Sequence, residues 1–155
     1  MPSDPKTTPP PPSPQLQTVL TWYHALASWD LDTVSSLMRD DYTHVTLPAT
    51  ADDGVKDKEE GLAYARGIAN LFGGFPVKHE IYDVVESGDK IWVHSKLLGS
   101  LPSGVTFNNE SLFLFTLAES RRGGRPQIKG VKEFVDTKML DSFRRSIGVA
   151  NNGST

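Results

Sequence analysis

The fold is decided by residues 77–98, which read VKHEIYDVVESGDKIWVHSKLL. On both sides of Ser87-Gly88-Asp89, β-branched and aromatic side chains alternate with polar ones, and this period of two is typical of half-buried strands. Gly88 supplies the backbone freedom that a tight turn needs. The stretch therefore predicts a hairpin of two antiparallel strands, Val77–Val85 and Lys90–Leu98.

Periodic patterns on both sides of the hairpin predict further elements. Two more strands follow it, and helical spacing of apolar residues precedes it. The predicted elements are helices at 16–27, 31–38 and 62–72, a brief strand at 42–47, a polar loop at 51–60, strands at 106–117 and 127–135, and a closing helix at 136–143. Helices gathered on one face of an antiparallel sheet define the α+β class. We expect a curved antiparallel sheet wrapped around three helices, with a pocket between the layers.

The composition indicates one domain with short extensions. The chain has 155 residues, of which 37% are hydrophobic, and a formal net charge of −3. Seven of the 11 prolines lie in residues 1–14, where the run Pro9–Pro12 predicts a disordered, proline-rich leader. We expect the folded domain at 15–147 and a disordered tail at 148–155.

The same composition excludes several classes of function. The slight acidic excess argues against a nucleic-acid binder, and no apolar run is long enough to cross a bilayer. The absence of Cys excludes thiolate chemistry, and the four His residues show no metal-ligand spacing. No glycine-rich phosphate motif occurs. We therefore predict a cytoplasmic protein with no cofactor, metal, nucleic-acid or membrane partner.

Three features carry a resemblance to a known family: the Trp22-Tyr23 pair, the Gly88-Asp89 turn and the KEFVDT stretch at 132–137. With the order of elements, they resemble the SnoaL-like branch of the NTF2-like superfamily over roughly residues 16–145. This branch has polyketide cyclases, limonene epoxide hydrolase and scytalone dehydratase among its relatives. The resemblance implies a cone-shaped α+β barrel and a homodimer packed through the outer face of the sheet.

The resemblance also implies roles for two residues. Glu133-Phe134-Val135-Asp136 resembles the Asp-aromatic-aromatic-Asp ending of limonene-epoxide-hydrolase-like members. The first carboxylate of that ending performs acid–base chemistry, and this role falls on Glu133. His79 resembles one of the two pocket histidines of scytalone dehydratase.

Strand alternation predicts which carboxylates share a pocket. Glu133 lies between Val131 and Val135 on one face of its strand, where a carboxylate suits a general acid or base. Glu110 lies on a face with leucines one strand earlier. If both carboxylates faced one pocket, one would act as the acid and the other as the base. The alternative for each is an exposed structural charge.

Histidines and several ring or amide side chains complete the candidate site. Histidine titrates nearest neutrality, so His94 and His79 join Glu133 and Glu110 as catalytic candidates. An inward-facing Asn109 would donate to an oxyanion. The predicted substrate-binding residues are Tyr23, His44, Asn109, Trp22, Trp92 and Phe113. For the histidines and Tyr23, the alternative is a packed core residue.

Two classes of function stay open. The first, which the resemblance implies, is a cofactor-independent enzyme that isomerises, cyclises or dehydrates a small hydrophobic ring compound. Its chemistry would be proton abstraction next to a carbonyl, with Glu133 as the base and Glu110 or His94 as the acid. The second is a non-catalytic protein of the same fold that binds a hydrophobic ligand, dimerises or acts as an adaptor.

Overall fold

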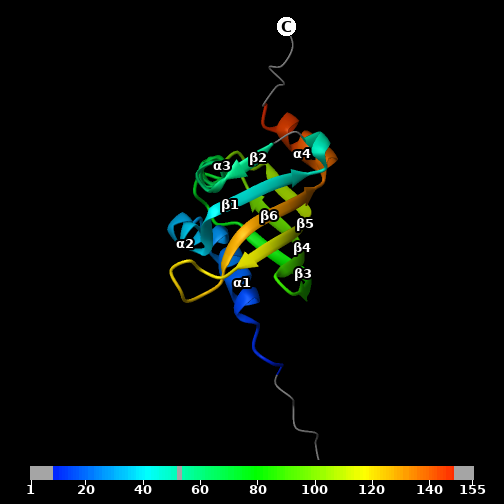
Figure 1. Cartoon of the computed structure of the whole chain (residues 1–155). Helices are drawn as coiled ribbons and strands as arrows, with labels where there is room; N and C mark the ends of the chain where they lie inside the picture. Colours follow the sequence, from blue (N-terminus) through cyan, green and yellow to red (C-terminus); the bar gives the residue numbers. More distant parts are fainter. Residues whose placement is uncertain (1–8, 52–53, 149–155) are drawn as a thin grey trace, which may run out of the picture.

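A six-stranded sheet with four helices forms the molecule in the computed structural model, which describes residues 9–51 and 54–148. Figure 1 shows the arrangement. The helices are α1 (Pro14–Ala27), α2 (Leu31–Leu37), α3 (Lys58–Leu71) and α4 (Thr137–Ser146), with one 3-10 turn at Ala49–Ala51. The strands are β1 (Met38–Leu47), β2 (Val55–Asp57), β3 (Lys78–Ser87), β4 (Lys90–Ser100), β5 (Thr106–Ala118) and β6 (Gln127–Val135).

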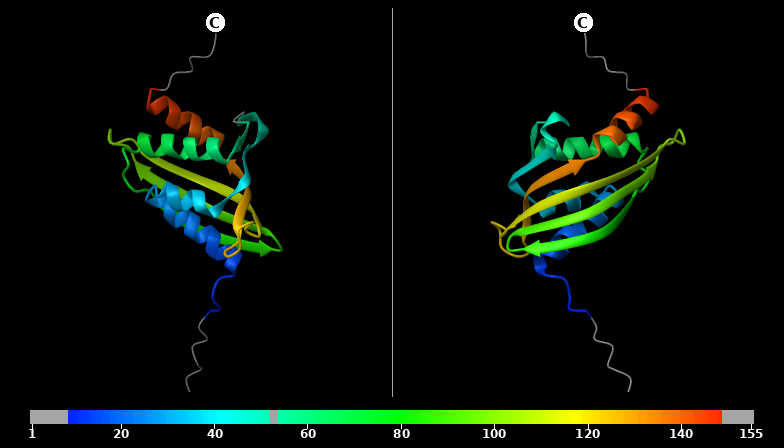
Figure 2. Two further views of the ribbon diagram at one scale, coloured as in Figure 1. Left: turned by 60° about the vertical axis from the view of Figure 1, so that its left-hand side comes forward. Right: turned by 90° about the vertical axis from the view of Figure 1, so that its right-hand side faces the viewer.

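The sheet is curved, and its strands run in the order β2-β1-β6-β5-β4-β3. In Figure 2 the helices lie on its concave side, and the outer face of β3, β4 and β5 is uncovered. The predicted α+β fold, a curved sheet wrapped around helices, is therefore confirmed. The predicted hairpin is confirmed as well, since β3 and β4 pair antiparallel across the Ser87–Lys90 turn.

The sheet is mixed, whereas the sequence patterns predicted an antiparallel one. The first strand, β1, pairs in parallel with β6 near the other end of the chain. Alternation along a strand reports which face is covered but carries no information about the direction of its neighbour. The predicted polar loop contains β2, which is only three residues long and too short to show a period.

Local capping explains where the helices begin. Pro14 is the first residue of α1, where its missing N–H costs no hydrogen bond, and the Ser13 side chain accepts from the Leu16 backbone N–H. Asp57 and Glu60 form a capping box at the start of α3. The chain leaves α3 through Gly73 and Gly74, which have the positive φ that glycine adopts without strain.

Two apolar clusters hold the layers together. The larger packs α1 and α2 on the sheet and contains Val19, Val93 and Phe115. The smaller gathers Phe72, Val77 and Phe107 beneath the end of α3 and against α4. Met38, predicted to end the second helix, instead begins β1 with its side chain buried. The gap between the two clusters is where a cavity lies.

Residues 1–8 of the predicted leader and 149–155 of the predicted tail lie outside the described residues, so both stay predictions. Within the described ranges, no helix combines the length and apolarity needed to cross a membrane.

Candidate functional site

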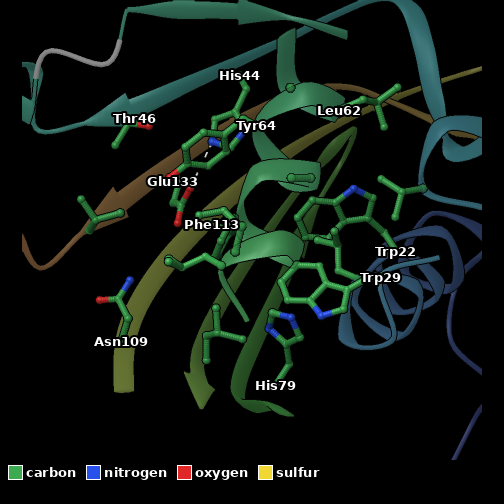
Figure 3. A pocket seen from close by; sticks show the side chains of 18 of the residues that line it. Trp22, Trp29, His44, Thr46, Leu62, Tyr64, His79, Asn109, Phe113 and Glu133 are labelled. Carbon is green, nitrogen blue, oxygen red and sulfur yellow. Dashed lines mark hydrogen bonds and ion pairs between the residues drawn. The ribbon is translucent and has the colours of Figure 1, made fainter. Parts of the chain in front are cut away.

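A cavity of about 170 Å³ lies between the concave face of the sheet and the helices α1, α3 and α4. Its wall is mostly aromatic and aliphatic, and residues of both apolar clusters contribute to it. Figure 3 shows 18 of the lining side chains. The polar members of the wall are Tyr42, His44, Thr46, Tyr64, His79, Asn109 and Glu133.

Glu133 and His44 meet at one side of this cavity. The parallel register pairs Thr46 with Glu133 and His44 with Val131, so His44 and Glu133 emerge on the same face of adjacent strands. The Nε2 atom of His44 lies 3.1 Å from Oε2 of Glu133. Only 12% and 19% of their side chains are exposed, respectively, so the pair is largely shielded from water. The sequence predicted both residues for the site.

Tyr42 extends this pair into a chain of three groups. It stands two residues before His44 on β1, and its hydroxyl lies 3.4 Å from His44 Nδ1. Burial and the nearby Glu133 carboxylate raise the pKa of the Tyr42 phenol above its ordinary value, so the phenol keeps its proton. A phenol that donates to Nδ1 leaves the imidazole proton on Nε2, where it faces the Glu133 carboxylate.

His79 lines the cavity from β3, far from Glu133 in the close-up view (Figure 3). Its ring contacts the Tyr23 ring, with centroids 5.1 Å apart. Burial lowers the pKa of His79 to about 4, because the cavity wall solvates the imidazolium poorly. Among the described residues, its ring nitrogens have no hydrogen-bond partner, so His79 offers the cavity a neutral imidazole.

Trp22, Phe113 and Asn109 line the cavity as the sequence predicted. The Trp22 and Phe113 rings pack edge to face with centroids 6.1 Å apart. Asn109 is buried on β5 and donates from Nδ2 to Ser111 Oγ at 3.2 Å. Two atoms of this group, Trp22 Nε1 and Asn109 Oδ1, have no hydrogen-bond partner in the described part of the chain.

Tyr23 is adjacent to the cavity but is not among its lining residues. Its hydroxyl lies 3.1 Å from Ser95 Oγ in the core, and its side chain is almost fully buried. Burial raises the pKa of Tyr23 above its ordinary value, although the hydrogen bond with Ser95 opposes the shift. The core alternative therefore describes Tyr23 better than substrate binding does.

Glu110, His94 and Trp92 lie on the opposite, outer face of the sheet. His94 Nε2 lies 2.5 Å from Glu110 Oε1, and His94 Nδ1 lies 3.7 Å from Asp83 Oδ2. The Trp92 side chain on the same face is 46% exposed. The expectation that Glu110 and Glu133 share a pocket is therefore wrong. Because β5 carries apolar side chains on both faces, alternation did not show which face is covered.

Sequence reasoning missed Tyr42 and the part of the wall that α3 supplies. Tyr42 had a detectable signal, because a residue two positions from His44 in a strand shares its face. Helix α3 places Leu62, Tyr64 and Ile68 over the cavity. The helical period of the sequence predicts that α3 has a buried face, but it does not show that this face covers a cavity. Among the described residues, no three His, Cys, Asp or Glu side chains lie close enough together to hold a metal.

Residues 19–125 match the SnoaL-like domain family. No curated protein matches the sequence. TerC, crystallised with polyporic acid, superposes with a TM-score of 0.70 at 15% identity, covering 86% of this chain and 99% of that one. The BvnE pinacolase from Penicillium brevicompactum superposes with a TM-score of 0.72 at 13% identity, covering 88% of this chain and 92% of that one. IdmH, a candidate polyketide cyclase from Streptomyces antibioticus, superposes with a TM-score of 0.67 at 20% identity, covering 83% of this chain and 96% of that one.

Proposed function

The chain belongs to the SnoaL-like domain family, and from this premise we propose that it is a cofactor-independent enzyme that moves a proton on a small hydrophobic ring compound. The observation that carries the proposal is the contact of 3.1 Å between His44 Nε2 and Glu133 Oε2 in the wall of an apolar cavity. A carboxylate beside a histidine, sheltered from water, is suited to general acid–base catalysis.

Glu133 is the general base in this proposal. Its Oε1 takes a proton from a carbon next to a substrate carbonyl, and the electron pair of the broken C–H bond moves into a new C=C bond. The carbonyl oxygen gains the negative charge. Return of the proton at a different atom completes an isomerisation, whereas loss of a β-hydroxyl as water completes a dehydration. Neither route needs an oxidant or a reductant.

His44 and Tyr42 orient the Glu133 carboxylate. The Nε2–H of His44 donates to Oε2 of Glu133 in this scheme, which fixes the orientation of the carboxylate and leaves Oε1 for the substrate. Tyr42 keeps the imidazole in this tautomer by donating to Nδ1. His79 contributes no charge in this scheme, since its lowered pKa of about 4 leaves it neutral near pH 7.

The structural neighbours support the direction of the proposal. One is a pinacolase, one is a candidate polyketide cyclase, and one was crystallised with polyporic acid. Glu133 and His44 meet in one cavity, whereas Glu110, the second carboxylate considered for the site, lies outside it. The buried Glu133–His44 pair supports the catalytic hypothesis over the alternative of a non-catalytic binding protein with a purely apolar cavity.

Hydrogen–deuterium exchange tests the proposal without knowledge of the product. Cyclic ketones are incubated with the protein in D₂O, and loss of the proton next to the carbonyl is followed by ¹H NMR. We expect Glu133→Gln to slow the exchange at least about 100-fold, since general bases contribute about 10²–10⁴. The matched control is Glu110→Gln on the outer face, which should exchange at the native rate. Equal rates for native and Glu133→Gln protein would refute the role of Glu133.

A homodimer formed through the outer face of the sheet is part of the same proposal. Trp92, Leu112 and Phe134 are 46%, 43% and 51% exposed on this face, and apolar side chains that cluster on one face are suited to an interface. Sedimentation equilibrium should give a dimer for the native chain and a monomer for Phe134→Glu. The cytoplasmic location expected from the sequence stays a prediction.

A further inference from the structure

Trp29 follows α1 in a backbone conformation that disfavours a large side chain. Among the described residues it is the one non-glycine residue with a positive φ, 58°. The N–H of Trp29 donates to the Leu26 carbonyl at 3.0 Å, and that of Asp30 donates to the Ala25 carbonyl at 2.9 Å. This pair of bonds forms a helix ending at which glycine is usual, because a Cβ crowds the backbone there. A tryptophan at such a position indicates that its side chain is needed.

The indole of Trp29 is held by two contacts. Its Nε1–H donates to the Phe75 carbonyl at 2.8 Å. Its ring stacks on Phe72 at the end of α3, with centroids 5.9 Å apart and an angle of 27° between the planes. Because the backbone already takes the N–H, the indole offers a ligand only its apolar ring surface.

This indole is also part of the cavity wall, which the sequence did not predict. In Figure 3 it lies on the same side of the space as His79, and Glu133 lies on a different side. A ligand whose reacting carbon faces Glu133 therefore extends from the carboxylate toward the side of the cavity that Trp29 closes.

The volume of the cavity sets the scale for the ligand. It is about 170 Å³. An engineered apolar cavity of about 150 Å³ binds benzene, so this space suits one ring with short substituents. Protein interiors are close-packed and resist overfilling, so a second fused ring requires that part of the wall be removed.

We propose that Trp29 determines the size of the ligand: its indole limits the cavity to compounds with one ring, and its removal admits compounds with two fused rings. The inference rests on the proposed function for its choice of site. The alternative is a purely structural indole, which holds the end of α3 through Phe72 and Phe75. A structural role alone would leave the preference for ring size unchanged.

Two ketones that differ by one fused ring test the proposal: acetophenone and 2-acetylnaphthalene. Each is titrated into the native protein and into Trp29→Gly, in which glycine fits the backbone of this helix ending. The native protein should bind acetophenone at least about 10-fold more tightly, because overfilling a packed cavity is costly. Trp29→Gly should bind 2-acetylnaphthalene more tightly than acetophenone. A native protein that binds the two ketones equally, or binds neither, would overturn the proposal.

Val77→Ala is the matched control for a general loosening of the structure. Val77 belongs to the same apolar cluster as Phe72, but it is not among the residues that line the cavity. This variant should keep the native preference for acetophenone. If Val77→Ala changed the preference as much as Trp29→Gly does, loosening of the cluster would explain the effect and the proposal would be refuted.

An NMR measurement on the native protein keeps the proposal testable even if Trp29→Gly fails to fold. The ring protons of bound acetophenone should show nuclear Overhauser contacts to the Trp29 indole protons. Bound acetophenone without such contacts would overturn the proposal.

The same two ketones separate this inference from the proposed function, because both carry exchangeable protons next to the carbonyl. Size-selective binding without proton exchange would retire the proposed function alone. Exchange that depends on Glu133, with the same preference for ring size in the native protein and Trp29→Gly, would retire this inference alone.

Discussion

His44 Nε2 lies 3.1 Å from Glu133 Oε2, although 89 positions separate the two residues along the chain. The parallel pairing of β1 with β6 brings them together, because it places the first strand in the chain beside the last strand in the chain. The apolar walls then shield the pair from water. The candidate chemistry of this protein therefore depends on one long-range strand pairing.

Tyr42→Phe tests the orientation of His44. Removing the hydroxyl takes away the donor to Nδ1 and leaves the ring free to adopt the other tautomer. We expect the Nε2–H tautomer to dominate in the native protein and a mixture in the variant, as measured by the ¹⁵N shifts of His44. The rate of ketone proton exchange should be about 2- to 10-fold lower in the variant, in line with the loss of one hydrogen bond. A native protein with the Nδ1–H tautomer would contradict the scheme.

His79→Phe tests the neutral imidazole in the cavity wall. The folded protein lowers the pKa of His79 to about 4 from an ordinary 6.5, so the unfolded chain binds more protons between these values. The native free energy of unfolding should therefore fall as the pH drops from 6.5 to 4, by an amount on the order of 3 kcal/mol.

The variant should lose this component of the pH dependence. Urea unfolding of both proteins at pH 7, 5.5 and 4 measures the free energy of unfolding as a function of pH. The same pH dependence in the native protein and the variant would show that His79 does not cause the loss of stability at low pH.

Gly99→Ala tests the packing of the smaller apolar cluster. A Cβ at this position would lie 2.6 Å from Phe72 Cε1 and 2.9 Å from Val77 Cγ1, so the cluster must shift. We expect a loss of about 1–3 kcal/mol in the free energy of unfolding, as for other overpacked cores.

The matched control is Gly67→Ala on α3, where the added Cβ meets nothing within 4 Å. That change should stabilise the protein by about 0.5–1 kcal/mol, because alanine favours a helix over glycine. The same sign of effect for both variants would contradict the close-packing argument.

Asp57→Ala tests the start of the helix that covers the cavity. The Asp57 side chain accepts from the Glu60 N–H at 2.9 Å, and the Glu60 side chain accepts from the Asp57 N–H. Loss of this cap should cost about 1 kcal/mol of stability, whereas Asp57→Asn, which still caps, should cost much less. Thermal unfolding compares the two, and equal losses would rule out the capping role.

Much of the candidate site was predictable residue by residue. Glu133, His44, His79, Asn109, Trp22 and Phe113 all line the cavity as expected. Glu110, His94 and Trp92 do not, because β4 and β5 carry apolar side chains on both faces and the pattern did not reveal which face the helices cover. Tyr42 was missed, although it stands two residues before His44 and therefore on the same face of the strand.

The sequence by itself determined the local structure: the hairpin at Ser87–Lys90, the helical stripes, the caps, and the face that Glu133 shares with two valines. These are short-range properties, set by backbone sterics and by the period of the apolar side chains. Only the tertiary structure decided that β1 lies beside β6, that the helices cover the inner face of the sheet, and that His44 and Glu133 meet in one cavity wall. Those features arise from contacts between distant segments, whose geometry no local pattern encodes.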